Sequence, residues 1–95
     1  MPEVQVKKIV FDRAFERKLK KYKKNLSEKE KDELKKRVKI FKNNVFDPRL
    51  ETHKLGGKLR NYWAFSINFT DRILFRFLGE GKVFFIDIGD HSIYR

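Results

Sequence analysis

Cysteine is absent from the 95 residues, so this chain forms neither a disulfide framework nor a thiolate metal site. No apolar run approaches the ~20 residues that a membrane-spanning helix needs, and the first residues lack the apolar segment of a signal peptide. The length suits one small domain, residues 1–95, and not two. These features predict a single-domain cytoplasmic protein.

Several catalytic patterns are missing as well. The two histidines lie far apart in the sequence, and no cluster of Asp, Glu and His has the spacing of metal ligands, so no metal or other cofactor is expected. The Gly-x-Ser-x-Gly motif of serine hydrolases is absent. The glycines at 79, 81 and 89 do not match a phosphate-binding loop at the start of a helix.

Positive charge is what the sequence has in excess. Lysine and arginine number 24 against 13 acidic residues, which gives a formal net charge of +11. Such an imbalance says nothing about the fold but favours an anionic partner. Nucleic acid, an acidic protein and an anionic membrane surface are the candidates.

The stretch from 59 to 88 contains three aromatic and β-branched runs separated by short turn signals, which is typical of a meander of strands. Alternation assigns the two faces. Trp63, Phe65, Ile67, Ile73, Phe75 and Phe77 point to one apolar face, and Arg72, Leu74 and Arg76 point to the other. The apolar face must be covered, whereas the face with two arginines can stay solvated and is expected to carry the function.

The first half predicts a strand over 4–10 and two helices. Asp12 is an expected N-cap for the first helix, whose apolar stripe runs from Phe11 to Leu26. Ser27 and Glu30 form a capping box for the second helix, which Asp47-Pro48 should end. The expected fold is α+β in the order β-α-α-β-β-β: two layers, with an antiparallel sheet covered on one face by a helical hairpin.

Titratable and cationic residues enter and leave the meander, and an antiparallel sheet can bring both ends together. This set comprises His53, Lys54, Lys58, Arg60, Arg72, Arg76, His91, Tyr94 and Arg95. Cleavage of RNA without a metal needs a base for the 2′-hydroxyl, a cation for the phosphoryl charge, and an acid for the leaving 5′-oxygen. Histidine serves as acid or base near neutral pH, arginine pairs with a phosphoryl group, and tyrosine stacks on a base.

Five segments together resemble the RelE/ParE toxin superfamily, with the YafQ-like or RelE/StbE-type mRNA interferases as the nearest branch. They are Asp47-Pro48-Arg49-Leu50, His53-Lys54-Leu55-Gly56-Gly57-Lys58-Leu59, Tyr62-Trp63-Ala64-Phe65-Ser66-Ile67-Asn68, Arg72-Ile73-Leu74-Phe75, and Asp87-Ile88-Gly89-Asp90-His91-Ser92-Ile93-Tyr94-Arg95. The resemblance covers the C-terminal half closely; in the N-terminal half it extends only to the strand and the helical hairpin.

The resemblance implies a toxin of a type II toxin–antitoxin module, a ribosome-dependent endoribonuclease that cuts mRNA. It implies a cognate antitoxin, which charge predicts to be acidic, and a toxin that is monomeric alone.

The resemblance also implies roles for single residues. It makes Arg72 the phosphate-binding residue, His91 and His53 the proton-transfer residues, and Tyr94 the aromatic that orients the substrate. Asp71 matches an acidic residue of that branch if a gap is allowed, and Ser66 stands where some members have another histidine. The catalytic lysines of RelE itself have no counterpart on the strand from Tyr62 to Asn68, so which group is acid and which is base stays open. Lys54, Lys58, Arg60, Arg76 and Arg95 are the expected RNA-binding residues.

Two other functions fit the same sequence. A ParE-like toxin would inhibit gyrase on this fold with no RNA chemistry, although binding alone does not need both histidines. A basic RNA-binding protein without enzymatic activity would bind RNA in a strongly salt-dependent way and release no cleaved product.

Overall fold

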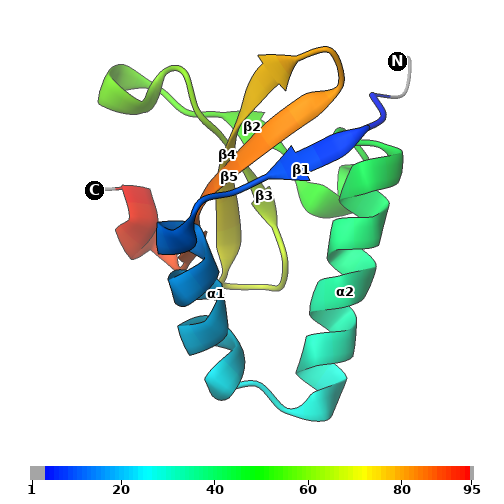
Figure 1. Cartoon of the computed structure of the whole chain (residues 1–95), viewed down its shortest axis with the longest axis vertical. Helices are drawn as coiled ribbons and strands as arrows, with labels where there is room; N and C mark the ends of the chain where they lie inside the picture. Colours follow the sequence, from blue (N-terminus) through cyan, green and yellow to red (C-terminus); the bar gives the residue numbers. More distant parts are fainter. Residues whose placement is uncertain (1–3, 95) are drawn as a thin grey trace.

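The computed structural model describes residues 4–94, in which two helices pack on one face of a five-stranded sheet (Figure 1). The strands are β1 (Lys8–Val10), β2 (His53–Lys54), β3 (Trp63–Ser66), β4 (Arg72–Gly79) and β5 (Lys82–Gly89). The helices are α1 (Arg13–Lys24) and α2 (Glu28–Asn43). Three short 3-10 turns complete the chain: η1 (Pro48–Leu50), η2 (Gly57–Leu59) and η3 (His91–Tyr94). The predicted α+β fold is confirmed.

The sheet has the order β1-β5-β4-β3-β2 and is mixed. The meander of β3, β4 and β5 is antiparallel as predicted, and β2 adds antiparallel to β3 at one edge. The first strand, however, pairs with β5 in parallel. The helical hairpin between β1 and the meander returns the chain to the end of the sheet at which β1 begins. The first and last strands therefore run in the same direction.

Both predicted helix starts are present. The Asp12 carboxylate accepts a hydrogen bond of 2.9 Å from the Phe15 amide at the start of α1. In α2 the Ser27 hydroxyl accepts from the Glu30 amide and the Glu30 carboxylate accepts from the Ser27 amide, at 3.1 and 2.9 Å. Each cap satisfies amides that the first turn of a helix leaves unpaired.

The end of α2 lies earlier than the proline predicts. The helix ends at Asn43, because Asn44 adopts extended backbone and its side-chain oxygen accepts from the amides of Val4 and Phe46. Val45, which a helix reaching Asp47 would include, is instead fully buried beyond the helix, and its amide donates to the Val4 carbonyl. This pairing also makes β1 shorter than the predicted strand, since Val4 and Val6 bond to the end of α2 instead of to the sheet.

Phenylalanine rings fill the space between the helices and the sheet. The Phe41 ring on α2 is completely buried and stacks on Phe65, with ring centroids 4.2 Å apart. Phe75 and Phe85 meet the same ring edge-on at 4.9 and 5.5 Å. The apolar face predicted by alternation is therefore the face that the helices cover.

The second face of the sheet, called the back face here, carries His53, Ala64, Ser66, Arg72, Leu74 and Arg76 by the strand registers. It is less solvated than predicted, because Ala64, Ser66 and Leu74 are buried. The C-terminal turn η3 supplies part of the cover, since a Cβ atom at Gly89 would lie 3.1 Å from the Ile93 side chain. No helix within residues 4–94 is long and apolar enough to cross a membrane.

Candidate functional site

The turn between β3 and β4, residues 68–71, is held by a dense set of side-chain hydrogen bonds. The Asn68 side-chain oxygen accepts from the amides of Thr70 and Asp71 at 3.0 and 2.7 Å. The Tyr22 hydroxyl on α1 donates to the Asp71 carboxylate at 2.6 Å, and the Asn68 amide group donates to both. Burial of Tyr22, and the Asp71 carboxylate beside it, raise the pKa of the Tyr22 hydroxyl, so it stays a donor. Asp71 thus connects the turn to a helix.

Arg72 opens β4 on the back face, immediately after this turn. One terminal nitrogen of its guanidinium donates to the carbonyls of Asn68 and Asp71, at 3.2 and 3.0 Å. No ion pair between described residues engages the guanidinium. No carboxylate among residues 4–94 neutralises it, so its remaining donors and its charge can act on a bound anion.

The C-terminal turn η3 folds back toward Arg72. Gly89 is the register partner of Arg72 on the neighbouring strand, and at its φ of +154° any larger residue would be strained, with the Ile93 side chain 3.1 Å from the added Cβ atom. The rings of His91 and Tyr94 meet edge-on at 5.9 Å. Burial raises the pKa of the Tyr94 hydroxyl, and the nearby positive charge of Arg72 opposes that rise.

His91 also borders the β3–β4 turn. A shallow pocket of about 540 Å³ is lined by Phe69 and Thr70 of the turn and by Asp90, His91 and Ser92 of the C-terminal segment. Arg72, His91 and Tyr94 are thus three of the predicted residues that the fold brings together around one turn.

Ser66 lies next to Arg72 on the back face, as its register partner on β3. The residue is 3% exposed, and its hydroxyl has no hydrogen-bond partner among the described residues. Buried hydroxyl groups are nearly always hydrogen-bonded, so an orphaned one marks a position that is not optimised for stability.

His53 and Lys54 lie on the edge strand β2 and point to different faces. His53 pairs with Ala64 and so shares the back face with Arg72, two strands away. Its Nδ1 atom lies 3.0 Å from the carbonyl oxygen of Glu51, to which it donates when that nitrogen carries the proton. Lys54 pairs with Trp63, on the face that the helices cover.

The other predicted RNA-binding residues are dispersed. Arg76 lies exposed on the back face, four residues beyond Arg72 along β4. Lys58 and Arg60 are exposed in the loop between β2 and β3, at the opposite end of these strands from Arg72. Arg95 lies outside the described residues.

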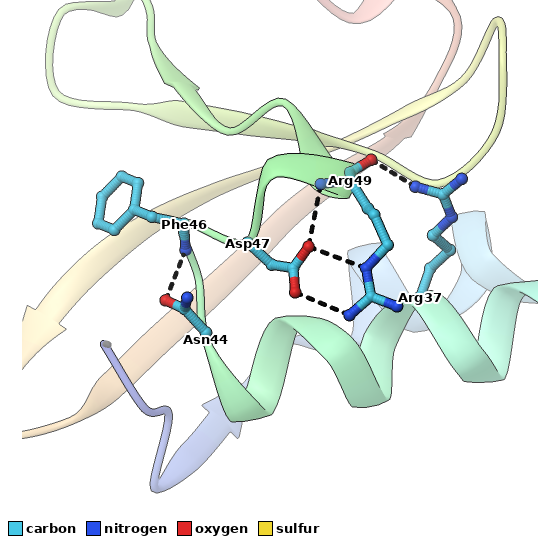
Figure 2. Close-up of polar contacts among 5 residues, drawn as sticks. All are labelled: Arg37, Asn44, Phe46, Asp47 and Arg49. Atoms are coloured by element: carbon cyan, nitrogen blue, oxygen red, sulfur yellow. Dashed lines mark hydrogen bonds and ion pairs between the residues drawn. The ribbon is translucent and has the colours of Figure 1, made fainter. Parts of the chain in front are cut away.

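A cluster of charged residues fixes the segment that leads to His53 (Figure 2). The Asp47 carboxylate accepts two hydrogen bonds from the Arg49 side chain, at 2.9 and 2.8 Å, and one from the Arg49 amide. Arg37 on α2 donates to the Arg49 carbonyl at 2.6 Å. The 3-10 turn η1 is thereby connected to α2, only a few residues before β2 begins.

Stability should depend on pH through this cluster. Hydrogen bonds from Arg49 lower the pKa of Asp47 from 3.8 to about 2. A lowered folded-state pKa stabilises the fold above the unfolded value and stops doing so as pH falls through the folded value. We therefore expect the parent to exceed Asp47→Asn in stability by a constant amount above about pH 4.5, and the difference to vanish as pH falls toward about 2. Urea unfolding across this pH range measures it.

Arg49→Met is the matched variant for that experiment. It removes the same ion pair from the cationic side, so it should abolish the same pH-dependent part of the stability. A parent-to-variant difference that stays constant down to pH 2 would contradict the assignment.

Comparison with known proteins shows similarity in structure and not in sequence. No protein-family model matches the chain, and no curated protein matches it. Several solved structures superpose over nearly the whole chain, among them three toxins. A copper-bound mutant toxin from Helicobacter pylori has a TM-score of 0.71 at 19% identity, over 93% of this chain and 98% of that one. YafQ from Escherichia coli has a TM-score of 0.72 at 16% identity, over 90% and 94%.

The third is the YoeB/ParE toxin from Agrobacterium tumefaciens, with a TM-score of 0.69 at 17% identity over 88% of this chain and 98% of that one. This chain has the fold of these toxins. The resemblance to the RelE/ParE superfamily is thus confirmed at the level of the fold. YafQ is also known in a complex with DinJ, described as a toxin–antitoxin complex.

Phe69 is the residue of this region that the sequence pattern did not single out. In the sequence Phe69 follows Phe65 and Ile67 at alternate positions, as a further strand residue would, but β3 ends at Ser66 and Phe69 stands at the tip of the turn. Its position between Asn68 and Thr70-Asp71 could have indicated a turn, because Asn and Asp side chains form hydrogen bonds with the backbone of turns.

Proposed function

We propose that this protein is the toxin of a toxin–antitoxin module and that it cuts mRNA on the ribosome. The supporting observation is the gathering of an unpaired guanidinium, an imidazole and a phenol around the β3–β4 turn, from Arg72, His91 and Tyr94. These three groups match the needs of phosphoryl chemistry, and they sit on a fold shared with YafQ.

The reaction begins with attack of a ribose 2′-oxygen on the adjacent phosphorus and ends with departure of the 5′-oxygen. A base takes the 2′-hydroxyl proton and an acid gives a proton to the 5′-oxygen, so the products are a 2′,3′-cyclic phosphate and a 5′-hydroxyl. Arg72 offers its free donors to the phosphoryl oxygens, on which charge grows in the transition state. The neutral Tyr94 hydroxyl is a donor beside that charge.

His91 and His53 are the proposed proton-transfer groups. His91 lies on the C-terminal turn, and His53 lies on the same face of the sheet two strands from β4. Two strand spacings amount to about 10 Å, and His53 lies in the row of Leu74, two residues along β4 from Arg72. In this proposal, RNA bound across the back face brings one phosphate between the two imidazoles, as acid and base require.

The ribosome as the place of cleavage is supported by charge. The net charge of +11 includes many exposed lysines on α1 and α2, far more than the few acidic side chains they pair with. Lysines of this kind bind phosphates without sequence preference and give strongly salt-dependent affinity. Ribosomal RNA offers such a surface around the mRNA.

An acidic antitoxin is the proposed protein partner. An apolar pocket of about 290 Å³ opens between α1 and α2, where Phe11, Leu19, Leu34 and Val38 line it beside Lys23 and Lys35. Phe11 remains 46% exposed there. An acidic segment with an apolar side would fill the apolar pocket and form ion pairs with the surrounding lysines.

Mapping of mRNA 5′ ends after induction tests the proposal. Expression should arrest growth, and new 5′ ends should appear in translated mRNA and disappear when initiation is blocked. A His91→Ala variant that folds should produce far fewer of these ends. Growth arrest without new ends, together with loss of gyrase supercoiling activity in a purified assay, would instead establish the gyrase-inhibitor alternative.

A further inference from the structure

Phe69 is almost completely exposed. Its side chain is 96% accessible, whereas the other exposed apolar side chains, Phe11, Phe77 and Leu78, reach only 46%, 38% and 42%. Large aromatic side chains usually bury most of their surface in a folded protein, so packing of the core does not account for the position of Phe69.

The turn that carries Phe69 is not a loose loop. The bonds within Asn68, Thr70 and Asp71 fix its backbone, and the Ile67 amide donates to the Asp71 carbonyl at its base. The Tyr22–Asp71 bond connects it to α1. Phe69 is therefore held in place by its neighbours while its ring touches solvent, which lowers the entropy lost when a partner binds.

The position of the ring is the second observation. Phe69 and His91 line the same shallow pocket, and Arg72 donates to the carbonyls of Asn68 and Asp71 on either side of the turn. A nucleotide whose phosphate meets Arg72 therefore has its neighbouring base within reach of this ring.

We propose that Phe69 stacks on an unpaired nucleobase of the mRNA next to the phosphate that is cut. This inference rests on the proposed nuclease function. Phenylalanine has no polar atom with which to read base edges, and every base has a π-face, so this contact holds any nucleotide in place. Phe69 would act in binding, and Arg72 and the histidines in the chemical steps.

Binding to programmed ribosomes tests this directly. The probe is an mRNA blocked by 2′-O-methyl groups around the cleavage position, so that it binds without being cut. Phe69→Ala should weaken binding of the protein by roughly 5- to 150-fold, the range of one lost base–aromatic stack. Phe69→Trp should restore it. Leu78→Ala, which truncates a partly exposed apolar residue at the far end of β4, is the control and should bind like the parent.

An abasic nucleotide in the mRNA identifies the stacked base. At one position beside the cleaved phosphate, the abasic mRNA should weaken binding of the parent as much as Phe69→Ala does, and the two changes together should cost no more than either alone. If Phe69→Ala binds programmed ribosomes like the parent, the stacking proposal is wrong, whether or not the variant cuts mRNA. The same holds if Phe69→Ala weakens binding to an antitoxin and leaves binding to ribosomes unchanged. If the parent binds with this dependence on Phe69 but leaves unblocked mRNA uncut, stacking holds and the nuclease proposal fails.

Discussion

Replacing Arg72 with alanine should lower the rate of mRNA cleavage on ribosomes by about 100- to 1000-fold, the usual cost of one lost donor to a transition-state oxyanion. The guanidinium forms no ion pair with a described carboxylate, and its two bonds go to backbone carbonyls of the adjoining turn. Its charge is therefore not already neutralised and would act fully on the phosphoryl group. Single-turnover cleavage of a defined mRNA on programmed ribosomes measures the effect.

Arg76→Ala is the matched control. It removes the same charge from the same face of the same strand, four residues away, so it should weaken binding through lost general attraction and leave the cleavage rate at saturation nearly unchanged. Arg72→Lys should fall between the two, because an ammonium keeps the charge but loses the planar array of donors. A folded Arg72→Ala protein that cuts like the parent would overturn the assigned site.

Phe41→Ala should destabilise the fold by about 3–5 kcal/mol, the usual cost of deleting a buried phenylalanine. The ring has no exposed surface and meets three other rings of the sheet, so the cavity left behind is lined by large side chains that collapse poorly. Small domains are stable by only about 5–15 kcal/mol. Urea unfolding followed by circular dichroism should show a midpoint far below that of the parent.

The natural control is another phenylalanine of the same chain. Phe69→Ala removes the same side chain from a position that is 96% exposed, so it should change stability by no more than about 0.5 kcal/mol. Equal unfolding midpoints for Phe41→Ala and the parent would mean that the ring cluster does not form the core.

Local signals in the sequence predicted most of the fold. The caps at Asp12 and Ser27 are local chemistry, and the alternation of Phe65, Ile73 and Phe75 reports directly which face is buried. The direction of β1 could not be found this way, because parallel pairing with β5 depends on contacts 74 residues apart, such as that of Lys8 with Lys82. The early end of α2 likewise depends on a hydrogen bond that the Val4 amide donates to the Asn44 side chain.

The candidate site was predictable in its residue types but not in its arrangement. The sequence identifies Arg72 and His91 as candidate residues. Their proximity depends on the turn η3, which brings the imidazole near the strand that carries the guanidinium. Alternation puts His53 and Lys54 on opposite faces, but which of the two shares the face of Arg72 is decided by the pairing partner on β3. Phe69 was hidden because an apolar residue at the end of an apolar run is indistinguishable, in sequence, from one more strand residue.

Gly89 makes the whole arrangement vulnerable to a single methyl group. Alanine at that position would need a backbone angle that side chains resist and would press on the Ile93 methyl group 3.1 Å away. We expect the last turn to shift relative to the sheet, and with it the imidazole and phenol beside Arg72, while the phenylalanine core on the other side of the strands stays as it is. A substitution at Gly89 could in this way leave the protein folded and still disturb the arrangement of Arg72, His91 and Tyr94.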